Sequence, residues 1–121
     1  MALKVHDSEL KVMEALWSLG EMTAAQLAKI LKEQVGWSRN TTYTVIGKLL
    51  EKGAVGRYEP NFVCKPIITR EQVQQYEAKE LIGKLFDGSA EMFLSAFISG
   101  GNISDAELER LKSIVENAKE V

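Results

Sequence analysis

Residues 38–66 read SRNTTYTVIGKLLEKGAVGRYEPNFVCKP, and they decide the fold because a helical pattern gives way to a strand pattern within them. Ser38 is a preferred residue for a helix N-cap, and Gly53 is typical of a helix C-terminus. Two short runs of aromatic and β-branched residues follow, and they flank a proline–asparagine turn signal. We therefore predict a helix over residues 38–52 and a β-hairpin over residues 54–66.

Two further helices are predicted before this stretch, each with a start signal and an apolar repeat. Asp7 precedes apolar residues at helical spacing, and Gly20 ends that pattern. The segment TAAQ at residues 23–26 is a capping box, which predicts a second helix that runs to about Glu33. Three helices followed by a β-hairpin form the winged-helix variant of the helix-turn-helix, whose third helix enters the major groove of DNA.

The remainder of the chain is predicted to be helical again. Capping boxes at residues 69–72 and 104–107, and a capping serine at Ser89, mark three more helix starts. These helices carry more apolar side chains than so short an arm can bury alone. The expected fold is mainly α with a small β-hairpin wing, divided into a winged-helix domain over 1–69 and a three-helix dimerisation domain over 70–121. The residues expected in the dimer interface are Leu81, Leu85, Phe93, Phe97, Leu108, Leu111 and Val115.

Composition excludes several classes of protein. The chain has 121 residues, of which 45% are hydrophobic and 26% are charged, as in one soluble globular domain or two very small ones. No apolar run approaches the ~18 residues of a membrane span, and the N-terminus has no signal-peptide core. We therefore expect a cytoplasmic protein without membrane insertion. A single cysteine and a single histidine exclude an internal disulfide and a cysteine-rich metal site, and we expect no metal and no cofactor.

The net charge of −2 is unevenly divided along the chain. Residues 1–70 hold ten Lys/Arg and seven Asp/Glu, a net charge of +3, whereas residues 71–121 hold five and ten, a net charge of −5. A basic front and an acidic back suggest that the first part faces a polyanion. An excess of three charges is also small enough to arise by chance, so the charge by itself does not decide the partner.

The predicted third helix has an apolar side and a polar side. The apolar side, which should pack on the first two helices, holds Thr42, Val45, Ile46 and Leu49. The polar side suits DNA, because Arg binds guanine bidentately, Asn binds adenine, and Thr binds phosphate or the thymine methyl. Taken in isolation, the same residues would also suit a solvated helix start. The expected DNA-binding residues are Arg39, Asn40, Thr41, Tyr43, Thr44 and Lys48 on this helix and Arg57 on the hairpin.

Nearly the whole chain carries short motifs, of which WSRNT at residues 37–41 is the most specific. The others are Asp7-x-Glu9-Leu10-x-Val12-Met13-x-x-Leu16-Trp17, Leu49-x-Glu51-Lys52-Gly53, Pro66, Thr69-Arg70-Glu71 and Leu85-Phe86-x-Gly88-Ser89. Together they resemble the penicillinase-repressor family, also called the BlaI/MecI/CopY family. The resemblance implies a homodimeric winged-helix repressor that binds palindromic operators with TACA/TGTA half-sites. Members of that family often control resistance genes and a membrane sensor-protease.

The chain departs from that family at several positions. Members released by proteolysis are cut at an Asn-Phe bond, and Ala96-Phe97 stands at that place here, so the resemblance leaves this cleavage route open. The Cys-x-Cys pair of copper-responsive members is absent, which excludes copper sensing by those residues. The wing is shorter than usual, with Cys64 where an aromatic residue is common. Gly47 removes one side chain from the reading helix.

We therefore expect a homodimeric transcriptional repressor that binds a palindromic operator through the third helix and the wing. It should be released when the dimerisation arm is cut or loosened. The expected partners are double-stranded operator DNA, a second copy of the chain and, for release by cutting, an inactivating protease. The alternative is a winged-helix protein–protein interaction module without DNA binding, which the acidic total charge and the short wing favour. An enzyme is not expected, because the sequence holds no Ser-His-Asp set and no phosphate-binding glycine loop.

Overall fold

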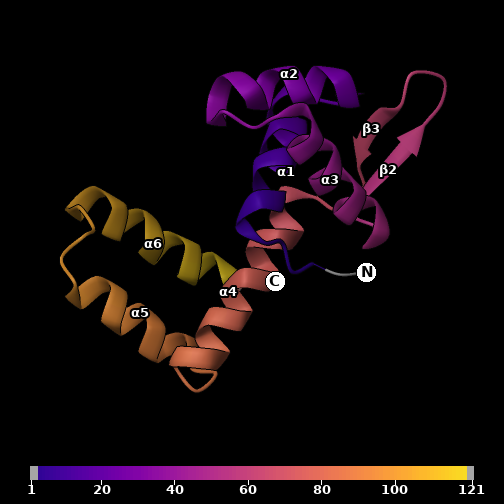
Figure 1. Ribbon diagram of the computed structural model, residues 1–121. Coiled ribbons are helices and arrows are strands. Elements are labelled where there is room, and N and C mark those ends of the chain that lie inside the picture. The colour runs from indigo at the N-terminus through magenta and orange to yellow at the C-terminus, as the bar shows by residue number, and fades with distance from the viewer. Residues whose placement is uncertain (1–2, 120–121) are drawn as a thin grey trace. The chain divides into compact units, whose positions relative to one another are not determined.

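A computed structural model describes residues 3–119, and these residues are mainly helical (Figure 1). The elements in chain order are α1 (Asp7–Leu19), β1 (Met22–Thr23), α2 (Ala24–Val35), α3 (Arg39–Glu51), β2 (Val55–Tyr58), β3 (Val63–Pro66), α4 (Arg70–Leu85), α5 (Ala90–Ser99) and α6 (Asp105–Ala118). Within the described part of the chain, no helix combines the length and the apolar character needed to cross a membrane.

The chain divides into two compact units, residues 1–78 and residues 79–121. This division lies within α4, whereas sequence analysis places the boundary before that helix, between residues 69 and 70. The first turn of α4 is part of the first unit because the buried side chain of Val73 belongs to its core. The first unit therefore contains the three N-terminal helices, the strands and the start of α4.

The predicted capping residues start α2 and α3. The N–H of Thr41 donates a hydrogen bond to the Oγ of Ser38 at 3.2 Å. Thr23 and Gln26 exchange side-chain and backbone hydrogen bonds of 2.9 and 3.1 Å, which is a complete capping box. Between the two helices, Gly36 has a φ of +74°, a left-handed conformation that favours glycine at a helix end. A tight turn therefore separates α2 from α3, as in a helix-turn-helix.

One apolar core joins α1, α2 and α3 to the sheet. The four residues predicted for the inner side of α3 are all buried, with at most 5% of their surface exposed. Trp17 and Trp37 pack at the edge of this core, and the Nε1 of Trp17 donates a hydrogen bond to the carbonyl of Ile68 at 3.0 Å. Burial of the inner side leaves the opposite side of α3 facing outward.

The wing is a three-stranded antiparallel sheet in the order β1-β3-β2, and its β2–β3 hairpin lies beside α3 (Figure 1). The predicted hairpin is present, and a third strand that the sequence analysis did not predict joins its edge. Met22 pairs with Cys64 and Thr23 pairs with Val63, which adds β1 to the edge of β3. A strand of two residues is too short to show an alternating pattern, and Thr23 is also the N-cap of α2.

The second unit contains the end of α4 together with α5 and α6. None of its described residues, 79–119, is buried. The rings of Phe86 and Phe93 meet edge to face at 5.5 Å, and the rings of Phe93 and Phe97 lie 5.9 Å apart. The first contact packs α5 against the residue that follows α4, and the second lies within α5; many large apolar side chains of the unit stay exposed.

Candidate nucleic-acid interface

The outer side of α3 presents most of the predicted DNA-binding residues to solvent. Tyr43 is half-buried, and the exposed residues are Arg39, Asn40, Thr41, Thr44 and Lys48. The Thr41 hydroxyl lies 3.0 Å from the Oγ of Ser38, so this side chain also takes part in the helix cap. The outer side of α3 therefore offers a guanidinium, an amide, two hydroxyls and an ammonium, which are groups that bind base edges and phosphates.

A chain of aromatic contacts connects α3 to the wing. An N–H of the Arg39 guanidinium donates a hydrogen bond to the Tyr43 hydroxyl at 3.0 Å. The Tyr43 ring meets the ring of Phe62 edge to face, with the ring centroids 5.9 Å apart. The guanidinium of Arg57 lies over the other ring of this pair, 3.7 Å from the Phe62 centroid. Phe62 therefore bridges α3 and the wing, in addition to the apolar core that the two elements share.

Sequence reasoning missed the role of Phe62, which it treated only as a strand residue of the hairpin. Its backbone carbonyl accepts a hydrogen bond from the N–H of Ala24 at 3.0 Å, so it also ties the wing to the start of α2. Its φ is +53°, a conformation that is uncommon for a bulky residue and persists only where the surroundings impose it. The proline–asparagine signal before it predicted the turn of the hairpin but not these contacts.

The two cations of the hairpin are both paired with carboxylates. The Nε of Arg57 donates to Glu59 at 2.7 Å, and Lys65 lies 3.2 Å from Glu21. The hydrogen bond from Arg57 holds the pKa of Glu59 below its usual value, so this carboxylate stays ionised beside the guanidinium. Arg57, predicted to contact DNA from the wing, therefore has its charge balanced within the hairpin itself.

An ion pair between the partly exposed Lys52 and the buried Glu9 fastens the C-terminal end of α3 to α1. The Nζ of Lys52 lies 2.7 Å from a carboxylate oxygen of Glu9 and also donates to the carbonyl of Lys4 at 2.8 Å. Burial opposes ionisation of Glu9, but the ammonium of Lys52 and the N–H of His6 more than compensate, and the pKa of Glu9 is lowered. Both ends of α3 are thus held, the first by its cap and the last by this pair.

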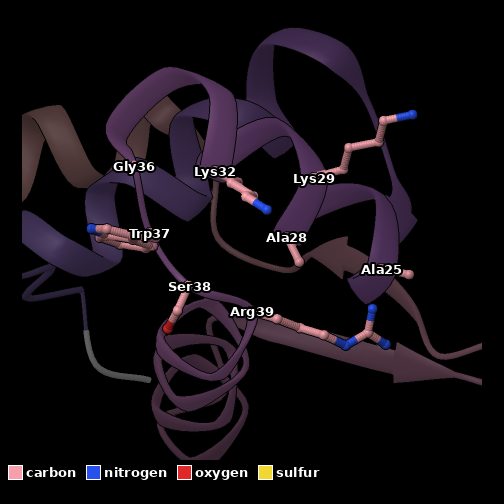
Figure 2. Close-up of a pocket in the computed structure, with 8 residues that line it drawn as sticks. All are labelled: Ala25, Ala28, Lys29, Lys32, Gly36, Trp37, Ser38 and Arg39. Carbon is pink, nitrogen blue, oxygen red and sulfur yellow. The ribbon is translucent and has the colours of Figure 1, made fainter.

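An open groove of about 620 Å³ lies where α2 meets the start of α3 (Figure 2). We call it the α2–α3 groove; its lining residues are Ala25, Ala28, Lys29, Lys32, Gly36, Trp37, Ser38 and Arg39. Figure 2 shows Lys29 and Lys32 projecting from α2, and Arg39 extending from the start of α3 toward Ala25. Sequence reasoning did not single out the two lysines, although their i,i+3 spacing on a helix places them on neighbouring positions of one surface.

Within residues 3–119, the single cysteine is not a reactive thiol, and the acidic residues do not gather into a metal-binding cluster. Cys64 has no exposed surface, and burial raises the pKa of its thiol to about 11 despite the nearby charge of Arg57. A thiol with so high a pKa stays protonated and unreactive at neutral pH. Among residues 3–119, no three His, Cys, Asp or Glu side chains lie close enough together to hold a metal ion.

The first unit is a helix-turn-helix with a three-stranded wing. Its third helix exposes a polar face, and both ends of that helix are fixed. These features define a winged-helix DNA-binding protein. The chain belongs to the penicillinase repressor family, because the model of that family matches residues 5–117. This result confirms the resemblance drawn from the sequence motifs. The protein is thus a winged-helix transcriptional repressor of that family and not an enzyme.

Individual relatives match over comparable lengths. The penicillinase repressor of Bacillus licheniformis is 24% identical over 118 residues, which cover 96% of this chain and 92% of that protein. The solution structure of the DNA-binding domain of the repressor BlaI matches 60% of this chain and 90% of its own, with 27% identity and a TM-score of 0.55. The monomeric form of Bacillus licheniformis BlaI in complex with the blaP half-operator matches 57% of this chain and 87% of its own, with 28% identity and a TM-score of 0.52.

Proposed function

We propose that this chain is a homodimeric repressor that acts in the cytoplasm on a palindromic operator. The outer side of α3 reads the bases of each half-site, and the C-terminal arm joins the two reading helices. Cutting or loosening the arm releases the DNA. The observation that carries the proposal is the polar outer side of α3, whose opposite side is buried and whose two ends are both fixed.

The relative solved with DNA supports the assignment of α3 as the reading helix. That protein is described in complex with a half-operator, and it matches the winged-helix part of this chain. In a helix-turn-helix, the N-terminal residues of the recognition helix contact base edges. Arg39 and Asn40 occupy the first turn of α3 and are exposed, so they are the residues we assign to base recognition. Lys48, farther along the same helix, is assigned to phosphate.

Exposed apolar side chains support the assignment of the arm as the dimer interface. Four of the seven residues predicted for this interface are more than 40% exposed, and the other three are half-buried; the four are Leu81, Leu85, Phe97 and Val115. A groove of about 690 Å³ between α5 and α6 is lined by further apolar side chains, which include Leu94, Ile98 and Ile114. Apolar surface of this kind marks an interaction site, and a second copy would bury it symmetrically.

Release through the arm is expected because the affinity of the dimer for the operator depends on two linked half-site contacts. A two-fold dimer presents two copies of α3, so its operator should be a palindrome with half-site centres about 10 bp apart, or a multiple of that spacing. Joining two weak half-site contacts through one arm makes the second contact intramolecular and raises the affinity about 10²-fold or more. A protease that cuts the arm, or any change that separates its two copies, would remove that gain without touching α3.

The test is binding of the full chain to the DNA upstream of its own gene, measured by gel shift. Arg39→Ala and Asn40→Ala should each weaken operator binding by about 1–3 kcal/mol and relax the base preference. Lys48→Ala should weaken binding to all duplexes about equally. If neither Arg39→Ala nor Asn40→Ala changes the base preference, the assignment of the reading face is wrong. A chain that binds no duplex DNA would instead favour a protein–protein interaction module.

A further inference from the structure

One side chain at the start of α4 makes three contacts with α1. The Nη2 of Arg70 donates hydrogen bonds to the carboxylate of Glu14 at 2.8 Å and to the hydroxyl of Ser18 at 3.0 Å. The same guanidinium lies over the ring of Trp17, 5.4 Å from its centroid, which is within the range of a cation–π interaction. We call these four residues the α1–α4 clasp. Both helices belong to the first unit at this point, and they can be followed in Figure 1.

The other contacts at this place hold the start of α4 without fixing its direction. The Nε1 of Trp17 donates to the carbonyl of Ile68, two residues before the helix, and the side chain of Val73 is buried in the core. Burial of an apolar side chain is favourable in many orientations, because the hydrophobic effect has no direction. Charge-assisted hydrogen bonds from an arginine do have a defined geometry. The clasp is therefore the contact that can set the angle at which α4 continues.

Stability alone does not account for the α1–α4 clasp. The side chains of Arg70 and Glu14 are 36% and 50% exposed, and an exposed ion pair contributes little to the free energy of unfolding. Among residues 3–119, this is also the one ion pair that joins α4 to the rest of its unit. Arg70 lies within the sequence motif Thr69-Arg70-Glu71, which the reading face of α3 does not explain.

We propose that Arg70 is a positioning residue for operator recognition, because the α1–α4 clasp sets the direction in which α4 leaves the winged-helix unit. That direction determines which spacing of half-sites the dimer accepts. The inference rests on the proposed function, since it requires two reading helices that are joined through the arm.

The length of α4 makes a small change of direction significant. The helix has 16 residues and is therefore about 24 Å long. A tilt of about 10° at its first turn displaces its other end by about 4 Å. One base pair of DNA rises by about 3.4 Å, so this displacement corresponds to about one base pair of half-site spacing. Without the clasp, the dimer should accept neighbouring spacings more evenly.

The experiment measures binding of the full chain to a series of operator duplexes by fluorescence anisotropy. The spacer between the half-sites is shortened or lengthened by one or two base pairs, and one further duplex carries a single half-site. For wild type, a change of one base pair should lower the affinity about tenfold, which is part of the gain from linked binding. For Arg70→Ala this loss should be about threefold or less, because the natural spacing is no longer favoured as strongly.

Two matched alanine variants separate orientation from charge. Glu14→Ala breaks the same clasp but removes a negative charge, so its effect on overall affinity for DNA should be opposite to that of Arg70→Ala. Its spacing profile should nevertheless flatten in the same way. Lys11→Ala removes a positive charge from an exposed position of α1 outside the clasp and should keep the wild-type profile. Alanine favours helices, so α1 and α4 should stay folded, which far-UV circular dichroism checks. If Arg70→Ala fails to fold, Glu14→Ala provides the same test.

The possible failures can be told apart. Wild-type spacing profiles in both clasp variants would overturn the inference while leaving the proposed function intact. An equal loss in Arg70→Ala on every duplex, the single half-site included, would also overturn it, because that result indicates a direct contact with phosphate. If wild type binds no operator, or binds all spacings equally, the proposed function fails, and this inference fails with it.

Discussion

Replacing Lys52 with methionine should destabilise the winged-helix unit strongly, because it leaves the carboxylate of Glu9 buried without a counter-charge. The Nζ of Lys52 lies 2.7 Å from Glu9, whose side chain is only 3% exposed. Removing one partner of a fully buried ion pair typically costs about 3–5 kcal/mol, and because the Lys52 side chain is 18% exposed we expect a cost near the lower end, about 2–3 kcal/mol. The free energy of unfolding of a small domain is about 5–15 kcal/mol, so Lys52→Met would remove a large part of it. Replacement of an exposed lysine such as Lys11 should cost less than about 0.5 kcal/mol.

The loss of stability in Lys52→Met should also depend on pH, and the direction of this dependence follows from the pKa of Glu9. In wild type the pKa of Glu9 lies below its ordinary value of 4.5, because the Lys52 ammonium and the His6 N–H outweigh the effect of burial. This carboxylate therefore contributes stability above pH 4.5, and the contribution is lost as the pH falls through the folded pKa. In Lys52→Met, burial is opposed by His6 but no longer by the ammonium, so the pKa of Glu9 should be higher than in wild type, and acidification should stabilise that variant relative to wild type.

The measurement is urea unfolding followed by far-UV circular dichroism, at one protein concentration, for wild type, Lys52→Met and Lys11→Met. We expect the cost of Lys52→Met to be largest at neutral pH and to shrink on acidification toward pH 4.5. The double variant Glu9→Gln/Lys52→Met should recover much of the loss, because it removes the uncompensated charge. An exposed ion pair contributes less than about 1 kcal/mol. A loss of unfolding free energy below that value in Lys52→Met at pH 7 would refute the reasoning. A loss that does not change with pH would refute it as well.

Three further predictions concern the wing, the cysteine and the arm. Glu59→Gln removes the carboxylate that is paired with Arg57, so the chain should bind any duplex more tightly and with a steeper salt dependence. Weaker binding, measured by fluorescence anisotropy, would contradict the pairing of Arg57 within the wing. Cys64, with a pKa of about 11 and no exposed surface, should react with a thiol reagent far more slowly in the native chain at pH 8 than in urea. Residues 1–78 should sediment as a monomer and bind the operator about 10²-fold more weakly than a dimeric full chain, and equal affinities would remove the arm from the mechanism.

Local chemistry is enough to predict the helices and the winged-helix fold. Thr23 and Ser38 cap α2 and α3 as expected, because an N-cap depends on residues at most three positions away. The inner side of α3 is predicted with similar success, since helical periodicity alone separates buried Ile46 and Leu49 from exposed Thr44. The polar composition of the outer side is therefore evident from the sequence, although composition does not say which side chains are already engaged by the protein.

The tertiary structure alone decided how those elements combine into a surface for DNA. Pairing of β1 with β3 and the contact of Phe62 with Tyr43 join segments far apart in the chain, and no short window of sequence reports such a pairing. The distribution of charge was decided in the same way. The sequence determined that Lys65 and Lys29 are cations of the same unit. Folding placed the first beside Glu21 and the second in a groove whose lining residues include no carboxylate, because electrostatic balance depends on distances in space and not on order along the chain.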